Sequence, residues 1–213
     1  MKRALFFQGG WNGHFPESIV HIFASELGHH GFQTDIEPSL ELLADAEKLS
    51  RYAVIFPCWT MGSLSPEQGA GLQKAVRAGV GLAGIHGGMG DAFRGNLDYE
   101  WMVGGHFVGH PHVGEYSVRL TDRDHPITAG LPAEFTYESE QYYLLTDPAI
   151  CLLAETDYLF EGRSCRMPVA WTRPWGKGRV FYSALGHHPD EFSRFPEALK
   201  LTLQGTLWAA GQL

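Results

Sequence analysis

Two short runs of the chain have no polar face, and they limit its fold more than any other feature. Residues 52–57 and residues 80–85 consist of apolar side chains and glycine. A strand of this composition is buried on both faces, as the central strands of parallel sheets are. Because parallel strands need a crossover between them, usually a helix, these runs predict a sheet covered by helices on both sides.

The first half of the chain alternates between strand-like and helix-like segments. Its clearest helix start is Ser65 followed by Pro66, because serine is a favoured N-cap and proline a favoured first helical residue. This alternation predicts a doubly wound α/β fold with a mostly parallel sheet. The expected strands are residues 3–8, 32–37, 52–57 and 79–86, and the expected helices are residues 16–30, 39–49 and the segment that Ser65 begins.

The second half has a different pattern, in which polar and apolar residues alternate over short stretches. Such alternation is typical of antiparallel strands with one covered face, so we expect antiparallel additions to the parallel sheet. A last helix is expected over residues 196–210, and residues 1–213 are expected to form one domain. The expected strands are residues 114–121, 134–138 and 150–156 and a hairpin of residues 168–172 and 178–182.

Charge and cysteine content exclude several classes of partner. The formal net charge is −8, and no basic cluster offsets it, so neither nucleic acid nor an anionic membrane surface is an expected partner. The first apolar stretch ends at Gln8, too early for a secretory signal, and no run has membrane-spanning length. The three widely spaced cysteines indicate reduced thiols and a cytoplasmic protein.

Histidines mark the expected site. His86 ends one apolar strand and is followed by two glycines, and His187 follows another strand. Ligands of open α/β sheets bind beyond the carboxyl ends of the strands, and imidazole can serve there as base, acid or metal ligand. His106 and His110 are four residues apart, but the glycines and proline around them favour an extended segment or loop over a helix. His14 lies in the glycine-rich first loop, and the sequence does not decide whether it belongs to the site.

Other side chains complete the set of candidates. Glu140 is the best carboxylate for catalysis, and Trp11, Trp59 and Tyr142 offer aromatic faces that could stack on a sugar ring. The glycine-rich segment 8–13 lacks the lysine of a phosphate-binding loop and the glycine spacing of a dinucleotide fingerprint, so no nucleotide cofactor is expected. Histidines expected to be structural or exposed to solvent are His21, His29, His30, His112 and His125.

An ordered series of short segments resembles the trehalose-utilisation, or ThuA-like, family. The resemblance implies a flavodoxin-like fold within the class I glutamine amidotransferase-like superfamily. It also implies a role in sugar catabolism, on 3-keto forms of disaccharides such as trehalose that a partner sugar dehydrogenase supplies. The matching segments are Gly84-Ile85-His86-Gly87-Gly88, Gly104-Gly105-His106-Phe107, His110-Pro111, His125-Pro126-Ile127-Thr128, Gly130-Leu131, Glu138-Ser139-Glu140-Gln141-Tyr142, Pro168-Val169-Ala170-Trp171 and residues 176–187.

The sequence departs from the amidotransferases at one decisive point. A glutaminase needs a cysteine nucleophile on the sharp turn between strand and helix. The corresponding turn here carries His86 and no thiol, while Cys58, Cys151 and Cys165 lie elsewhere. Glutaminase activity is therefore not expected.

The working hypothesis is base-catalysed processing of a 3-keto glycoside by elimination, hydrolysis or isomerisation. His187 or Glu140 would be the base, and His86 and His106 would act as electrophiles or as ligands of a divalent metal ion such as zinc. Trp11, Trp59, Tyr142 and His110 would contact the substrate. Two alternatives stay open: a non-catalytic module that binds a carbohydrate or a partner, and a metal-dependent hydrolase of an unrelated small molecule. A homo-oligomer is also open.

Overall fold

All nine strands of the protein lie in one sheet, which changes character halfway across. The structure is a computed structural model that describes residues 1–213. The strand order is β2-β1-β3-β4-β9-β8-β7-β5-β6. The strands are β1 (Lys2–Gly10), β2 (Phe32–Glu37), β3 (Val54–Thr60), β4 (Gly81–Ile85), β5 (Gly105–Leu120), β6 (Glu134–Thr146), β7 (Cys151–Phe160), β8 (Arg163–Trp175) and β9 (Gly178–Ser183).

The five strands from β2 to β9 are parallel. Their order, with β9 as the fifth strand, is that of flavodoxin-like sheets, in which the strand order reverses beside the first strand. The predicted doubly wound α/β fold is therefore confirmed. β3 and β4 are buried along almost their whole length, as the two runs without a polar face required.

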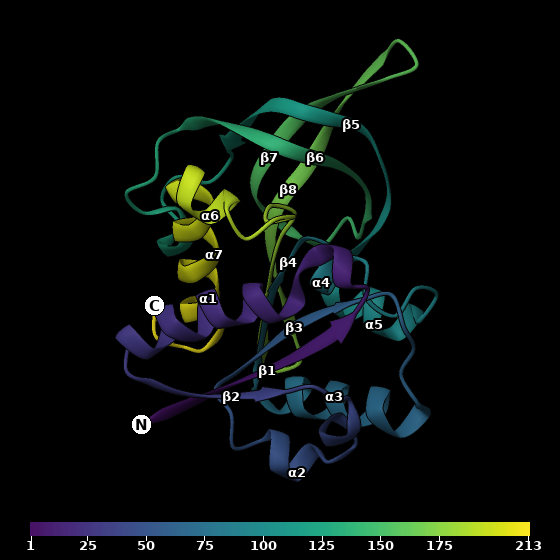
Figure 1. The fold of residues 1–213 in the computed structure, drawn as a ribbon, viewed down its shortest axis with the longest axis vertical. Coiled ribbons are helices and arrows are strands. Elements are labelled where there is room, and N and C mark those ends of the chain that lie inside the picture. The colour runs from purple at the N-terminus through teal and green to yellow at the C-terminus, as the bar shows by residue number, and fades with distance from the viewer.

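The remaining four strands are antiparallel and extend the sheet. In Figure 1 they rise above the parallel part, and the β7–β8 hairpin projects furthest. β5 begins nine residues before the expected segment 114–121, and β6 ends eight residues after the expected segment 134–138. β5 contains register shifts between Phe107 and His112, where glycine and proline interrupt the alternation, so the pattern did not reveal the start of the strand.

Helices cover both faces of the parallel part. Phe23 of α1 and Leu201 of α7 belong to one core cluster, and Leu72 of α3 and Met102 of α5 belong to the other. Trp171 is fully buried, and Trp208 is partly buried against the first cluster. The helices are α1 (Pro16–His29), α2 (Ala46–Leu49), α3 (Pro66–Ala78), α4 (His86–Gly90), α5 (Leu97–Val103), α6 (Glu191–Arg194) and α7 (Pro196–Ala209), with single 3-10 turns at Asn12–His14, Glu41–Ala44 and Pro126–Thr128.

Two helical regions differ from the expectation. The predicted helix over residues 39–49 is divided into a 3-10 turn and the short α2, whose N-cap is Asp45. The sequence did not predict α4, because its glycines hide the helical periodicity, or α5, which is only seven residues long. None of the helices combines the length and the apolar character that crossing a membrane would need.

Candidate functional site

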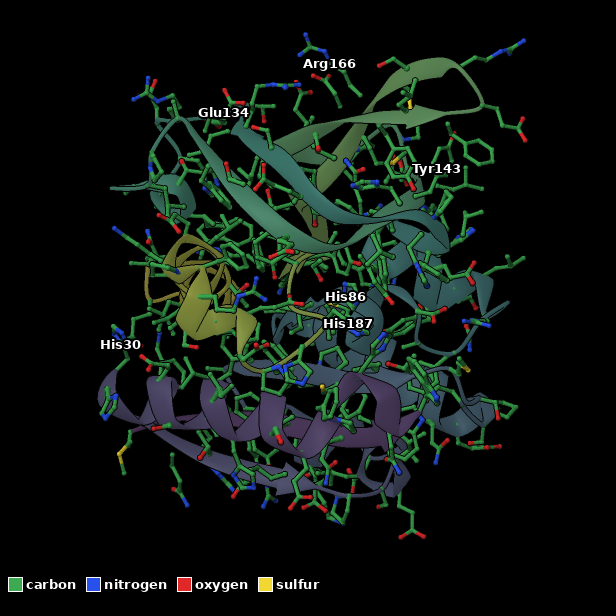
Figure 2. The ribbon with its side chains drawn as sticks, turned by 45° about the horizontal axis from the view of Figure 1, so that its top comes forward. His30, His86, Glu134, Tyr143, Arg166 and His187 are labelled. Atoms are coloured by element: carbon green, nitrogen blue, oxygen red, sulfur yellow. The ribbon has the colours of Figure 1, made fainter.

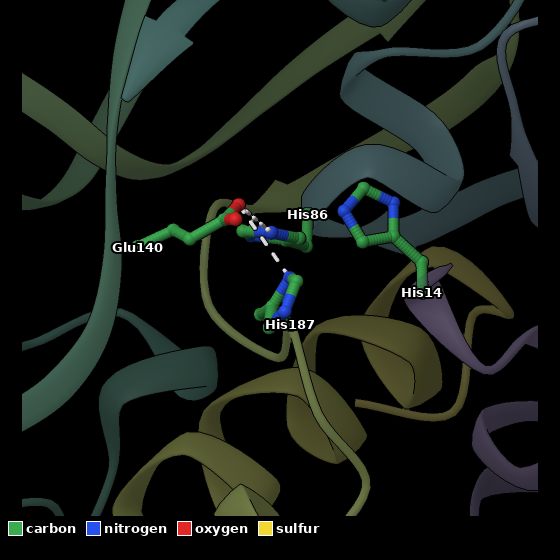
Figure 3. Close-up of side chains that lie close together, drawn as sticks. All are labelled: His14, His86, Glu140 and His187. Carbon is green, nitrogen blue, oxygen red and sulfur yellow. Dashed lines mark hydrogen bonds and ion pairs between the residues drawn. The ribbon is translucent and has the colours of Figure 1, made fainter. Parts of the chain in front are cut away.

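Four side chains from distant parts of the chain converge where the parallel strands meet the antiparallel extension. His14 follows β1, His86 follows β4, His187 follows β9, and Glu140 lies on β6. One potential ligand atom from each lies within 4.8 Å of those of the other three. Figure 2 places His86 and His187 in the middle of the molecule, between its two parts, and Figure 3 shows all four side chains facing one another.

The backbone at His86 turns sharply from strand to helix. His86 is the first residue of α4 and has φ of 39°, a left-handed value that is uncommon for a residue with a side chain. The next residue must be small, because a Cβ on Gly87 would lie 2.2 Å from Cε1 of His14. The turn therefore aims the buried His86 ring at the cluster and allows His14 to approach the backbone of α4.

The bonds of His86 fix its tautomer. Nδ1 lies 2.8 Å from the carbonyl oxygen of Ala184, and Nε2 lies 3.2 Å from Oε2 of Glu140. Because a carbonyl can only accept, Nδ1 carries the proton. A neutral ring would then direct the lone pair of Nε2 at a carboxylate, which is repulsive. The pair is stable when His86 is protonated or when a cation lies beside both groups.

The ring of His86 is also clamped from one side. Tyr142 stacks on it with centroids 3.8 Å apart and is itself 3% exposed. Tyr142 is covered in turn by Phe107, 4.5 Å away. Sequence reasoning offered Tyr142 as a platform for a sugar, but its buried face supports His86 instead, since its position behind the imidazole leaves no open ring face for a ligand.

His14 is the most strongly perturbed histidine of the cluster. Its Nδ1 lies 2.7 Å from Oγ1 of Thr60, and the residue is 7% exposed. Burial, and after it the charges of His86 and His187, together lower the pKa of His14 to about 3. The ring is therefore neutral at physiological pH, and its second nitrogen is free to bind a ligand or a cation.

His187 differs from the other two histidines. Its Nδ1 lies 3.4 Å from Oε2 of Glu140, is buried, and has no hydrogen-bond partner. Burial and then the charge of His86 lower the pKa of His187. The His187 side chain is 25% exposed, against 2% for His86, so it is the more accessible of the two.

Glu140 supplies the negative charge of the cluster. Burial raises its pKa, but the hydrogen bond from His86 and the charges of His86, His187 and His110 outweigh that effect, and its pKa falls to about 2. It is thus ionised at neutral pH. Nε2 of His110 lies 3.5 Å from Oε1 of Glu140, and the His110 side chain is 40% exposed.

The donor set fits a divalent metal ion. In a metal-binding imidazole, the ring nitrogen that does not bind the ion is usually hydrogen-bonded to a polar group of the protein. His86 has such a bond with Ala184, and His14 has one with Thr60. Neutral imidazole nitrogens and a carboxylate are ligands that zinc and similar ions accept. A positive ion would also relieve the repulsion between His86 and Glu140.

His106 does not take part in this cluster, contrary to the prediction that it would share a metal with His86. It pairs with Leu145 on β6, five residues from Glu140, which is about 16 Å along a strand. Its Nδ1 lies 3.3 Å from Glu100 instead. Because strand register, and not sequence spacing, decides which residues meet, the motif alone could not separate His106 from His110.

Of the two predicted tryptophans, Trp11 contacts the cluster. Trp11 is 47% exposed, and its ring meets the edge of His14 with centroids 4.8 Å apart. Trp59 is half-buried and packs against Gly9, where an added Cβ would lie 2.6 Å from its ring. Trp11 is therefore the more open surface for a ligand.

His14 is the member of the cluster that sequence reasoning left undecided. The one available signal was its place in the glycine-rich loop that leaves the carboxyl end of the first strand. Its partner Thr60 gave no signal, because a threonine at the end of β3 is ordinary in a strand.

Comparison with known proteins places the chain in a family. The sequence profile of the ThuA family, described as trehalose utilisation, matches residues 3–209. A ThuA-like protein from Bacteroides uniformis is 20% identical, with 99% of this chain and 91% of that chain covered and a TM-score of 0.78. One from Parabacteroides merdae is 19% identical, with 98% and 90% covered and a TM-score of 0.79.

A more distant likeness extends to part of a larger enzyme. The β-galactosidase of Bacillus circulans is 18% identical, with 98% of this chain but only 30% of that chain covered and a TM-score of 0.62. At such identities these likenesses show the fold alone. No curated protein matches the chain. Because the family profile covers nearly all of its length, the protein belongs to the ThuA trehalose-utilisation family.

Proposed function

We propose that this protein is a sugar-catabolic enzyme that acts on a 3-keto glycoside, such as an oxidised disaccharide of the trehalose type. The observation that carries the proposal is the convergence of His14, His86, His187 and Glu140, with ligand atoms within 4.8 Å of one another. The family's link to trehalose utilisation supports the class of substrate. The cluster supports the chemistry, because it combines an acceptor of protons with groups that can stabilise an oxyanion.

A ketone at C3 of a sugar makes the proton at C2 acidic. A base removes that proton, and the electron pair left on C2 expels the glycosidic oxygen from C1, which leaves with a proton as an alcohol. Addition of water to the resulting enone completes hydrolysis. Return of the proton to the other face of C2 gives isomerisation instead. Each route passes through an enolate whose oxygen needs stabilisation.

The hydrogen bonds of the rings support different roles for the three histidines. His14 and His86 each have one nitrogen held by the protein, so with Glu140 they form the set suited to hold a divalent ion. Such an ion would polarise the ketone oxygen. His187 has no such bond, is the more accessible ring, and has a lowered pKa. It is therefore neutral at neutral pH and suited to take the C2 proton.

The surroundings support binding of a sugar. Trp11 offers an exposed aromatic face beside His14, and apolar C–H faces of pyranoses pack well on such rings. His110, beside Glu140 and 40% exposed, is placed to donate to a sugar hydroxyl. We further propose that a sugar dehydrogenase supplies the keto substrate.

We also propose that the protein acts in the cytoplasm. Two solved structures of similar fold come from proteins described as cytoplasmic in Salmonella.

The test is an assay of trehalose and 3-ketotrehalose side by side, with analysis of all sugar products. Conversion of the keto form alone supports the proposal. Binding of either sugar without products would instead support a non-catalytic carbohydrate-binding module. Conversion of neither sugar, together with metal-dependent hydrolysis of other esters or amides, would support the unrelated hydrolase. Elemental analysis of protein prepared without a histidine tag tests the divalent ion separately.

A further inference from the structure

A buried carboxylate outside the cluster is hydrogen-bonded to the two segments that carry Glu140 and His187. Glu191, the first residue of α6, is 3% exposed. Its Oε1 accepts a hydrogen bond from Ser139 at 2.7 Å, and its Oε2 accepts one from the backbone N–H of His187 at 3.0 Å and one from the hydroxyl of Tyr137. All three donors are neutral.

The phenol of Tyr137 extends this network to the neighbouring peptide. Its oxygen accepts the backbone N–H of Gly186 at 2.9 Å while its proton goes to Glu191. Burial and the charge of Glu191 raise the pKa of Tyr137 well above its usual value, so the phenol stays protonated and continues to donate. The N–H of His187 is thus bonded to Glu191 directly, and the N–H of Gly186 is connected to the same carboxylate through the Tyr137 hydroxyl.

The same carboxylate holds the strand that carries Glu140. Tyr137 and Ser139 lie on β6 immediately before Glu140, so Glu191 joins β6 to the turn that leaves β9. A buried carboxylate is costly unless hydrogen bonds compensate it. The three bonds that compensate Glu191 all come from β6 and from the turn that carries His187.

The imidazole of His187 makes this tie important. Its buried Nδ1 has no hydrogen bond and lies 3.4 Å from Glu140, and its ring meets His14 and His86 only edge-on. The backbone of the turn, in which Gly186 has φ of 98°, therefore contributes to where the imidazole lies. We propose that Glu191 is a positioning residue that holds His187 beside Glu140. The role assigned to the ring rests on the proposed function, whereas its placement does not.

The experiment compares the wild type with Glu191→Gln and Tyr137→Phe, and uses Glu155→Gln as the matched control. Glu155 is another buried carboxylate, 7% exposed, but it pairs with Arg119 and Arg166 on the antiparallel extension. Each variant is characterised by a crystal structure, by Co²⁺ affinity from its visible absorption, and by kcat and KM for 3-ketotrehalose.

We expect Glu191→Gln to move the Gly186–His187 turn and to lower kcat roughly 100-fold, because misplacement of a reacting group by about 1 Å has that effect. KM and Co²⁺ affinity should stay within about twofold, because His14 and His86 keep their own bonds and Glu140 stays paired with β5 in the β5–β6 ladder. Tyr137→Phe removes the acceptor for Gly186 and one donor to Glu191 but leaves the bond from the His187 N–H, so it should act in the same direction but less strongly. Glu155→Gln should change neither kcat nor the turn.

An imidazole of His187 that stays within about 0.5 Å of its wild-type place in both variants would overturn the proposal. So would a loss of Co²⁺ affinity as large as the loss of kcat, because Glu191 would then support the whole cluster and not His187 in particular. If the wild type converts no keto sugar, the proposed function fails, and the two crystal structures still decide whether Glu191 places His187. If Glu191→Gln does not fold, Tyr137→Phe carries the same test.

Discussion

At the scale of single residues, the useful distinction among the three histidines is which ring nitrogens the protein already holds. His86 and His14 each have Nδ1 bonded to a fixed partner, whereas the buried Nδ1 of His187 has none. A held imidazole is oriented for one task, such as binding an ion. The His187 ring, whose Nδ1 faces Glu140 at 3.4 Å, can gain and lose a proton without breaking a hydrogen bond.

Replacement of His86 by glutamine should abolish most turnover of a 3-keto disaccharide. Loss of a group that stabilises an oxyanion typically lowers kcat by about 100- to 1000-fold. Steady-state kinetics measure the loss, and circular dichroism checks the fold. His112→Gln is the control, because His112 is exposed on β5 outside the cluster; equal activity of both variants would contradict the role of His86.

Replacement of Cys58 by alanine should leave activity nearly unchanged. Burial raises the pKa of Cys58 to about 12, so its thiol is not ionised at neutral pH and is a poor nucleophile. The assay for 3-ketotrehalose and a test for ammonia release from glutamine check this point. If the wild type hydrolysed glutamine and Cys58→Ala did not, the protein would be an amidotransferase, contrary to the sequence prediction.

Acid should destabilise the protein partly through His14. The native pKa of His14 is about 3, whereas in the unfolded chain it is about 6.5. Between these values the unfolded state binds the extra proton, so this group lowers the free energy of unfolding by up to about 1.4 kcal/mol per pH unit as pH falls. Glu140, with a pKa of about 2, acts in the same direction below about pH 4.3.

Urea unfolding of the metal-free protein from pH 7 to pH 4 measures this effect. In His14→Gln the stability should depend less steeply on pH between pH 6.5 and pH 4, because the group that titrates is absent. A pH dependence identical to that of the wild type would show that His14 is not held neutral by burial.

At the scale of elements, the sequence predicts a helix or strand well where neighbouring residues determine its start or end. The start of α3 is an example: Ser65 and Gln68 form a full capping box, with Pro66 at the first helical position. The strand β5 shows the opposite case. Its bulges between Phe107 and His112 shift the register against β6, and register is a property of two strands, so the sequence of one could not reveal which histidine would meet Glu140.

Ser65→Ala should lower the free energy of unfolding by about 1 kcal/mol, the usual effect of losing an N-cap. Denaturant unfolding measures it. Ser63→Ala is the control, because Ser63 is exposed two residues earlier and outside the cap. An equal change in both variants would mean that the cap contributes nothing specific.

At the scale of the whole molecule, the alternating first half and the patterned second half of the sequence were enough to predict the sheet and its two kinds of strand. The residues that meet at its centre were only partly predictable. His86, His187 and Glu140 were named from strand ends and family motifs, and the structure brings them together. His14 was left undecided and His106 was misplaced, because both depend on how separate parts of the sheet pack.

A divalent ion should stabilise the folded protein if the cluster binds it. At a free concentration 100 times Kd, the gain is about 2.7 kcal/mol, so Zn²⁺ or Co²⁺ should raise Tm and a chelator should reverse the rise. Differential scanning calorimetry measures both. Glu140→Gln should lose most of the shift; a shift that persists in this variant would place the ion elsewhere.

The four side chains of the cluster are drawn from positions between residue 14 and residue 187, on strands that lie on both sides of the change from parallel to antiparallel pairing. An ion held there would tie the two ends of the chain to its middle, as a crosslink over long loops does. Release of the ion should then precede global unfolding, so the lifetime of the native state would depend on how slowly the ion dissociates.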